Sequence, residues 1–264
     1  MEILDDDHEG RNGGARRVRV NPLRIGGRTR RNGKAVAFFL VAGTLLAGAG
    51  SAKAQSGHDQ YLTWCKGEDV GRKIAGCSAL IESGKETPEI LAIAYLNRGN
   101  ALDDNGQIDM AIQDYDQAIK NNPQNAEAFF RRGAALEQKG EFDRAIADLD
   151  TAIKLDPNNA KAFADRGRAY SHKKDFDHAI EDYTQSIKLD PNVGHTFSLR
   201  AYAYEQKAQY DLALADCESA LKLDSDDALA YYVRGLAKQK KGDKSGGKAD
   251  IAKAKQFDPK VDQE

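Results

Sequence analysis

The sequence contains few prolines and histidines and no strong excess of positive charge. Six prolines in 264 residues leave long stretches free to form uninterrupted helices. After the N-terminal segment, no histidine stands at metal-ligand spacing from another histidine or a cysteine, so we expect no metal site. No glycine-rich run follows a predicted strand, which argues against a phosphate-binding loop. We therefore expect no cofactor and no catalytic residue.

Residues 1–54 differ from the rest and have the pattern of an export signal. A basic stretch precedes an apolar run over residues 35–50, and small residues stand at Ala52 and Ala54. We expect cleavage after Ala54, by the general secretory or the twin-arginine route, and a periplasmic or secreted protein of a Gram-negative-type envelope. The alternative is an uncleaved membrane anchor, although the apolar run is short for a span.

Removal of this segment makes the chain more acidic. Residues 1–54 hold ten basic and five acidic residues, and the remainder holds 29 basic and 36 acidic residues, a net charge near −7. Nucleic acids and anionic membranes both require a basic patch on the protein. We therefore exclude nucleic acid as a main partner, and expect membrane contact only through an uncleaved N-terminal segment.

A strict periodicity runs through the remaining chain. Arginine followed by a small residue recurs at equal spacing at Arg98, Arg132, Arg166, Arg200 and Arg234. Alanines recur with the same period at Ala111, Ala145, Ala179 and Ala213, and prolines at Pro123, Pro157 and Pro191. Within one period, Phe129, Arg132, Gly133 and Leu136 have the spacing of one face of a helix.

This pattern resembles the tetratricopeptide repeat family, whose unit is a helix–turn–helix with the same period, about 34 residues. A boundary before Ala92 gives five repeats, at 92–125, 126–159, 160–193, 194–227 and 228–261. Residues 55–91 are expected to be a degenerate first helix pair. The resemblance implies an all-α fold, a right-handed superhelical solenoid of antiparallel helix pairs (an α-α superhelix).

Three further features agree with stacked helix pairs. Glycines 106, 140 and 242 stand where first helices should end. We expect aspartates to act as N-caps of the second helices, at Asp109, Asp143, Asp177 and Asp211. In the last repeat two apolar positions become Lys248 and Lys255, which predicts that the array ends there because a terminal repeat has no following neighbour.

The cysteines lead to two different expectations. One period before the small residues 99 and 111 stand Cys65 and Cys77, where paired helices approach most closely. In an oxidising compartment we expect a disulfide between them, and two buried thiols are the alternative. Cys217 replaces a core residue, so we expect a buried free thiol rather than the nucleophile of an unrecognised hydrolase.

The five arginines have an equally regular set of acidic partners. Each is followed at one fixed spacing by an aspartate, at Asp114, Asp148, Asp182, Asp216 and Asp250. Both sets lie on inward faces, where an unpaired charge is costly, so we predict a structural ladder, within or between repeats. The alternative is a cationic strip for an anionic ligand.

The family resemblance also implies that first helices line a concave groove that binds a partner peptide or helix. The predicted lining residues are Asn100, Phe130, Glu137, Arg168, His172, Tyr202, Glu205 and Tyr232. Aromatics and arginine are the usual interface anchors, so we expect Phe130, Arg168, Tyr202 and Tyr232 to lead, unless the aromatics pack between repeats. The predicted function is a scaffold or adaptor that binds a protein or peptide. A membrane-tethered scaffold and a hydrolase are the alternatives.

Overall fold

The computed structural model describes residues 45–262, and all elements within this range are helices. The basic flank and most of the apolar run of the predicted export signal lie outside these residues. The helices are α1 (Leu45–Lys66), α2 (Val70–Ser83), α3 (Pro88–Asp104), α4 (Ile108–Asn121), α5 (Ala126–Gln138), α6 (Phe142–Leu155), α7 (Ala160–His172), α8 (Phe176–Leu189), α9 (Gly194–Gln206), α10 (Tyr210–Leu223), α11 (Ala228–Lys240) and α12 (Lys244–Phe257).

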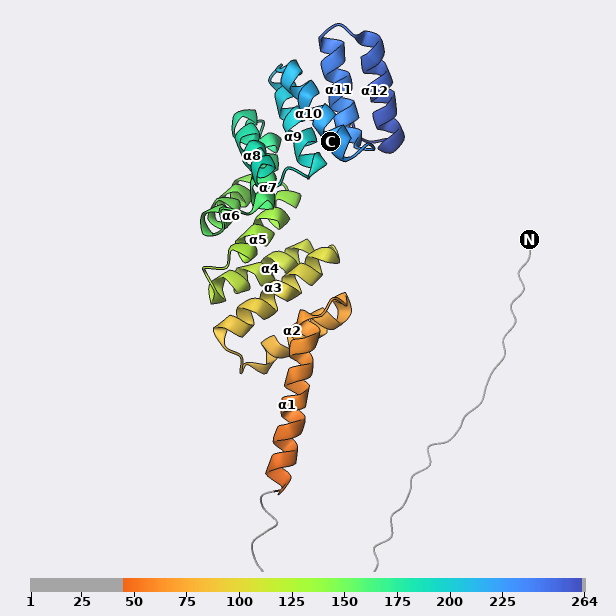
Figure 1. Cartoon of the computed structure of the whole chain (residues 1–264). Helices are drawn as coiled ribbons and strands as arrows, with labels where there is room; N and C mark the ends of the chain where they lie inside the picture. The colour runs from red at the N-terminus through yellow and green to blue at the C-terminus, as the bar shows by residue number, and fades with distance from the viewer. Residues whose placement is uncertain (1–44, 263–264) are drawn as a thin grey trace, which may run out of the picture. The chain divides into compact units, whose positions relative to one another are not determined.

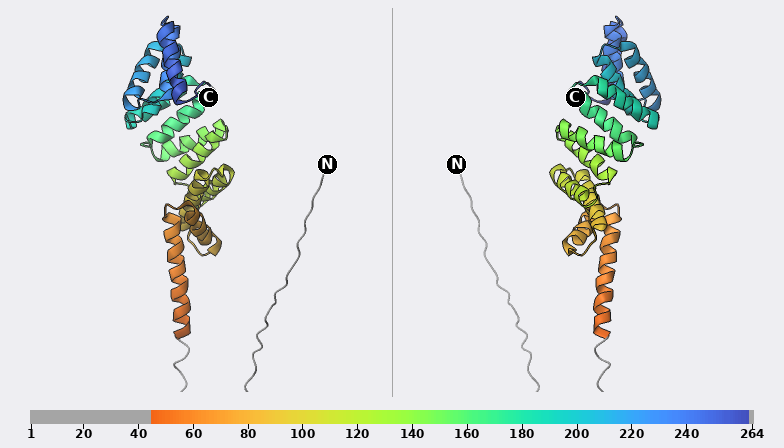
Figure 2. Two further views of the ribbon diagram at one scale, coloured as in Figure 1. Left: turned by 90° about the vertical axis from the view of Figure 1, so that its right-hand side faces the viewer. Right: turned by 90° about the vertical axis from the view of Figure 1, so that its left-hand side faces the viewer.

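From α3 onward the helices form pairs that follow one another in a solenoid (Figure 1). Each second helix also packs against the first helix of the next pair, so the pairs are in contact along the stack, and the buried residues described here form five hydrophobic clusters. Side views show that successive pairs are turned relative to one another, as in a superhelix (Figure 2). One helix pair cannot cover its own apolar face, and stacking completes the burial.

The first helices begin close to the predicted repeat boundaries. Helices α5, α7, α9 and α11 begin at residues 126, 160, 194 and 228, each the first residue of a predicted repeat. Helix α3 instead begins at Pro88, four residues before the predicted boundary. The Thr87 side chain accepts a hydrogen bond from the Ile90 amide, and proline is favoured at the first helical position, so the helix begins earlier here.

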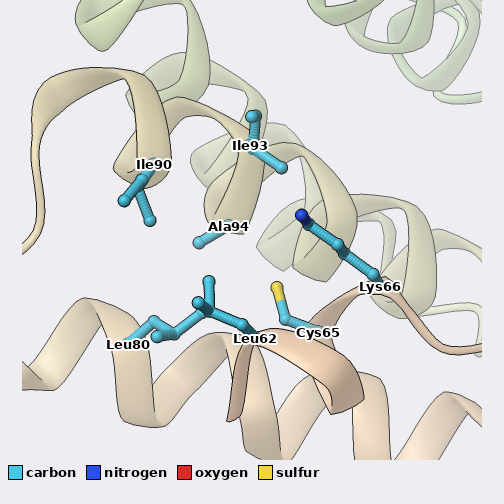
Figure 3. Close-up of a pocket in the computed structure, with 7 residues that line it drawn as sticks. All are labelled: Leu62, Cys65, Lys66, Leu80, Ile90, Ile93 and Ala94. Carbon is cyan, nitrogen blue, oxygen red and sulfur yellow. The ribbon is translucent and has the colours of Figure 1, made fainter. Parts of the chain in front are cut away.

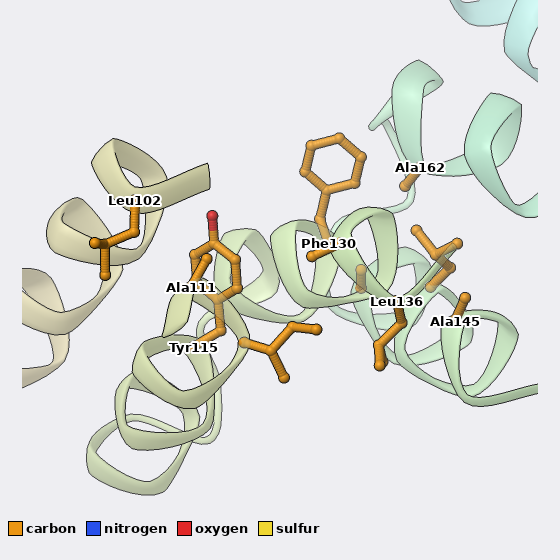
Figure 4. Close-up of a cluster of buried hydrophobic side chains, with 11 residues drawn as sticks. Leu102, Ala111, Tyr115, Phe130, Leu136, Ala145 and Ala162 are labelled. Atoms are coloured by element: carbon orange, nitrogen blue, oxygen red, sulfur yellow. The ribbon is translucent and has the colours of Figure 1, made fainter. Parts of the chain in front are cut away.

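A small residue on each first helix allows close packing against its partner helix. A Cβ atom on Gly133 would lie 2.8 Å from Cγ of Leu149, and one on Gly99 would lie 2.7 Å from the ring of Tyr115. Tyr115 and Leu149 are fully buried, and the cluster that contains them spans α3 to α7 (Figure 4). The periodic glycines therefore set the distance within a pair.

The predicted N-caps of the second helices are wrong. The caps of α4, α6, α8 and α10 are residues 107, 141, 175 and 209, two positions before the aspartates. The aspartates lie in the first helical turn instead, where the positive end of the helix dipole favours a carboxylate. Each also pairs with a lysine of the next repeat, as described below.

The two ends of the array are closed differently. At the C-terminal end, Lys248 and Lys255 of α12 are exposed, and Val261 packs with Tyr231 and Ala254. At the N-terminal end, a disulfide joins Cys65 of α1 to Cys77 of α2, with 4.6 Å between the Cα atoms. Among the described helices, none is long and apolar enough to cross a membrane.

Candidate functional site

The first helices of the pairs line the inner face of the solenoid. Helix α5 contacts α3 and α7, and α9 contacts α7 and α11. The second helices α4, α6, α8, α10 and α12 make no contacts of this kind with one another in the described chain. Because neighbouring elements approach more closely on the inner side of a curved stack, this face belongs to α3, α5, α7, α9 and α11.

The arginines and aspartates of the predicted ladder pair within each repeat. Nε and Nη2 of each arginine donate to the two carboxylate oxygens of the aspartate that follows it in the same repeat, at 2.6–2.8 Å. The pairs are Arg98–Asp114, Arg132–Asp148, Arg166–Asp182, Arg200–Asp216 and Arg234–Asp250. All five aspartates are buried, so each repeat carries one forked ion pair between its two helices.

Four of these arginines also reach back one repeat through Nη1. The acceptors are Ser78 for Arg98, Asp116 for Arg132, Asp150 for Arg166 and Thr184 for Arg200. Hydrogen bonding to Asp148, followed by the charge of that carboxylate, raises the pKa of Arg132 against the opposing effect of burial. These guanidinium groups are therefore occupied by the fold, which favours the structural role over a strip for anionic ligands.

A second ladder, not predicted from the sequence, lies at the turns within the helix pairs. A lysine after each first helix pairs with an aspartate of the preceding repeat, in Lys139–Asp109, Lys173–Asp143, Lys207–Asp177 and Lys241–Asp211. The first pair has 2.6 Å between Nζ and Oδ1. The lysines recur with the period of the repeats, and this recurrence was the signal that could have revealed them.

Three of the predicted groove residues are largely buried. Phe130 is 6% exposed and packs in the cluster that spans α3 to α7 (Figure 4). Its role as an exposed anchor is therefore wrong, since its position on the helix faces neighbouring repeats. Glu137 and Glu205 are each 9% exposed, and they occupy the same position in the second and fourth repeats.

Glu137 is held by residues of the next repeat. Arg168 donates from Nε and Nη2 to its two carboxylate oxygens, at 2.9 and 3.0 Å. His172 places Nε2 3.3 Å from the same carboxylate and stacks on Phe142. Asp165 lies 3.2 Å from Arg168, and its burial raises its pKa to about 6 although Arg168 opposes the shift. Arg168 and His172 are thus partly committed to contacts within the protein.

Three other predicted residues are half-buried on the inner face: Asn100, Tyr202 and Tyr232. Asn100 accepts a hydrogen bond from the hydroxyl of Tyr115 at 3.0 Å. Tyr202 meets Phe176 edge to face, and Tyr232 packs beside the C-terminal cluster. Glu205 accepts a hydrogen bond from Gln206 at 2.9 Å, and no cation pairs with it in the described chain. Tyr202 and Tyr232 therefore remain as partly exposed aromatic candidates.

Two features bear on the alternatives that involve chemistry, the thiol of Cys217 and any cluster of metal-ligating side chains. Cys217 is a fully buried free thiol, and burial raises its pKa to about 12, so it is a poor nucleophile. Among residues 55–262, no group of three histidine, cysteine or acidic side chains could hold a metal ion.

The described surface includes two shallow depressions. One lies between α1, α2 and α3 beside Cys65, and Leu62, Leu80 and Ile90 line it (Figure 3). Its volume of about 50 Å³ is far below that of small-molecule sites. The other lies on the inner face, has a volume of about 210 Å³, and is lined by Asp103, Ala134, Ala135, Glu137, Gln138 and Arg168. This second depression has room for a side chain.

Stacked antiparallel helix pairs with an open inner face define an α-helical repeat scaffold. Comparison with family models identifies the scaffold, since models described as tetratricopeptide repeat match residues 96–160, 160–193 and 195–227. The chain belongs to the tetratricopeptide repeat family, and its function is that of a non-enzymatic protein–protein interaction scaffold. A comparison with curated proteins found no match.

Solved structures share the fold at low sequence identity. A crystal structure of MamA protein is 23% identical, with a TM-score of 0.57, over 66% of this chain and 94% of that one. MamA from Desulfovibrio magneticus RS-1 is 20% identical, with a TM-score of 0.59, over 64% of this chain and 96% of that one. YrrB, described as a TPR protein with an unusual peptide-binding site, is 21% identical, with a TM-score of 0.58, over 69% of this chain and 92% of YrrB.

Proposed function

We propose that this protein is an exported scaffold of the cell envelope that binds an extended peptide or a helix of a partner protein along its inner face. The observation that carries the proposal is the pair of partly exposed aromatics on adjacent first helices, Tyr202 on α9 and Tyr232 on α11. Aromatic side chains supply large contact areas and are the commonest interface anchors. The similarity to YrrB, which has a peptide-binding site, supports a binding role of this kind.

The proposed location rests on the cysteines and the N-terminal pattern. A disulfide such as Cys65–Cys77 persists in oxidising compartments, which supports export. The alternative is a scaffold tethered through a retained N-terminal segment. Helix α1 runs without a break from Leu45 to Lys66, through the predicted cleavage position after Ala54. N-terminal sequencing of the protein from the exporting cell separates the two, because a start at Gln55 supports cleavage and an intact segment supports the tether.

Proximity labelling in the exporting cell, followed by pull-down of the labelled partner, tests the binding role. We expect Tyr202→Ala and Tyr232→Ala to reduce recovery of the partner. Leu212→Ala is the matched control, because Leu212 is 50% exposed on the second helix α10 and its loss removes apolar surface away from the inner face. If Tyr202→Ala and Tyr232→Ala recover as much partner as Leu212→Ala and the unchanged protein do, the inner face is rejected as the binding surface.

A further inference from the structure

The inner-face depression lies where the second repeat has the small Ala134 at a position at which the third repeat has the long Arg168. Asp103 and Glu137 occupy the same position in consecutive repeats, near the C-terminal ends of α3 and α5. In the following repeats, Ala134 and Arg168 likewise occupy equivalent positions. Asp103 and Ala134 therefore correspond to Glu137 and Arg168, one repeat earlier.

The later pair shows what this arrangement can hold. Arg168 reaches across from α7 and binds both oxygens of Glu137 at 2.9 and 3.0 Å. A carboxylate at this position can thus receive a guanidinium group from the direction of the next repeat. One repeat earlier, Ala134 contributes only a methyl group, and the depression of about 210 Å³ remains there. This volume suits one long side chain and is below the range of small-molecule sites.

Three charged residues line the depression, and two of them, Arg168 and Glu137, form an ion pair with each other, so the remaining Asp103 favours a cation. Asp103 makes no ion pair within residues 55–262, and the exposed Asp104 adds a second carboxylate beside it. Burial, followed by the charge of Asp104, raises the pKa of Asp103. Arg131 acts in the opposite direction, but its Nε already donates to Glu127 at 2.6 Å. A positive group would therefore find a carboxylate that the protein leaves without a counter-ion.

We propose that this depression binds a lysine or arginine side chain of the partner, with Asp103 as its counter-ion. The inference rests on the proposed function, because it requires the partner to lie along the inner face. The inference restricts the partner to a protein or peptide with a basic segment, and it disfavours a segment whose only charge is a terminal carboxylate. In this arrangement the partner supplies the group that Arg168 supplies internally to Glu137.

Selection of a phage-displayed random heptapeptide library on the full chain tests the inference while the natural partner is still unidentified. We expect enrichment of lysine or arginine at one position. The synthetic consensus peptide should bind Asp103→Asn about tenfold more weakly than the unchanged protein in fluorescence anisotropy. Glu218→Gln, which neutralises an exposed carboxylate on α10, is the charge-matched control and should bind normally.

A second set of variants fills the depression. Ala134→Arg introduces the residue that the next repeat has at this position, so we expect it to abolish peptide binding and to raise the melting temperature. Ala134→Leu fills the same space without charge, so it should block the peptide without raising the melting temperature through an ion pair. If Ala134→Arg does not fold, Ala134→Leu and Asp103→Asn still decide the matter.

The outcomes separate this inference from the proposed function. Peptides that lose binding in Tyr202→Ala, but that lack basic residues or ignore Asp103→Asn, would overturn the inference and leave the inner-face role intact. Failure to select any peptide would overturn the inference, and selected peptides whose binding no inner-face variant changes would overturn both.

Discussion

The Arg132–Asp148 pair allows a strong test of the structural ladder. Asp148 is 7% exposed and accepts two charge-assisted hydrogen bonds from Arg132, at 2.6 and 2.7 Å. Removal of one partner of a buried ion pair typically costs about 3–5 kcal/mol because the other charge is left uncompensated. Arg132 keeps a contact with Asp116 at 2.6 Å, which relieves part of that cost. We therefore expect Asp148→Ala to lower the free energy of unfolding by about 3 kcal/mol.

Two comparisons within the chain sharpen this expectation. The side chain of Asp116 is 46% exposed, so Asp116→Ala should cost less than about 1 kcal/mol. In the fourth repeat, Arg200 has Thr184 in place of this second carboxylate, so Asp216→Ala should cost more than Asp148→Ala, about 5 kcal/mol.

Urea unfolding followed by circular dichroism measures these differences, and hydrogen exchange shows whether the loss is confined to one repeat. Local loss is expected because each repeat contacts only its neighbours. Adding Arg132→Met to Asp148→Ala should recover part of the stability, because it removes the stranded charge. An Asp148→Ala protein that keeps full stability yet loses peptide binding would refute the structural role and restore the ligand strip.

Three other changes test separate parts of the structure. The buried hydroxyl of Tyr183 has no well-formed hydrogen bond among the described residues, so Tyr183→Phe should raise the free energy of unfolding by about 1 kcal/mol. Tyr115→Phe instead loses the hydrogen bond to Asn100 and should lower the free energy of unfolding by a similar amount. Equal effects of the two substitutions in urea unfolding would contradict this expectation. Since burial raises the pKa of Asp165 to about 6, above the unfolded value near 3.9, this group makes stability fall as the pH rises from about 4 to 6. The decline amounts to at most about 3 kcal/mol, and Asp165→Asn should remove it. If the melting temperature of Asp165→Asn depends on pH as that of the unchanged protein does, the raised pKa of Asp165 is ruled out as the cause. A Cβ atom on Gly76 would lie 2.8 Å from backbone atoms of α1, so Gly76→Ala should displace α1 and slow formation of the disulfide. Thiol trapping during refolding measures this rate, and an unchanged rate would contradict the close packing of α1 on α2.

The repeat architecture was accessible from the sequence because it depends on local, periodic features. The regular spacing of Arg132 and its equivalents identified the helix pairs, and α5 begins at the expected residue 126. The partner of each arginine within its own repeat was less accessible. Asp148 follows Arg132 and Asp116 precedes it at the same separation along the chain, and the structure uses both.

The binding face was harder to predict because exposure depends on contacts between repeats. Phe130 has a groove position in the family pattern, yet α3, α4, α6 and α7 contribute to the cluster that buries it. Glu137 and Glu205 are equivalent in sequence, but only Glu137 meets an arginine, since the next repeat has Arg168 in one case and Leu236 in the other. Such differences arise between side chains nearly a whole repeat apart, beyond any helical period.

The lysine–aspartate pairs at the turns have a mechanical consequence. They join adjacent repeats along a single edge. The aspartate side chains of these pairs are 76–85% exposed to solvent. Dissolved ions weaken such exposed pairs far more than the buried Arg–Asp forks. We therefore expect concentrated salt to loosen the contacts between adjacent repeats along this edge and to change the curvature of the superhelix, while every helix stays folded.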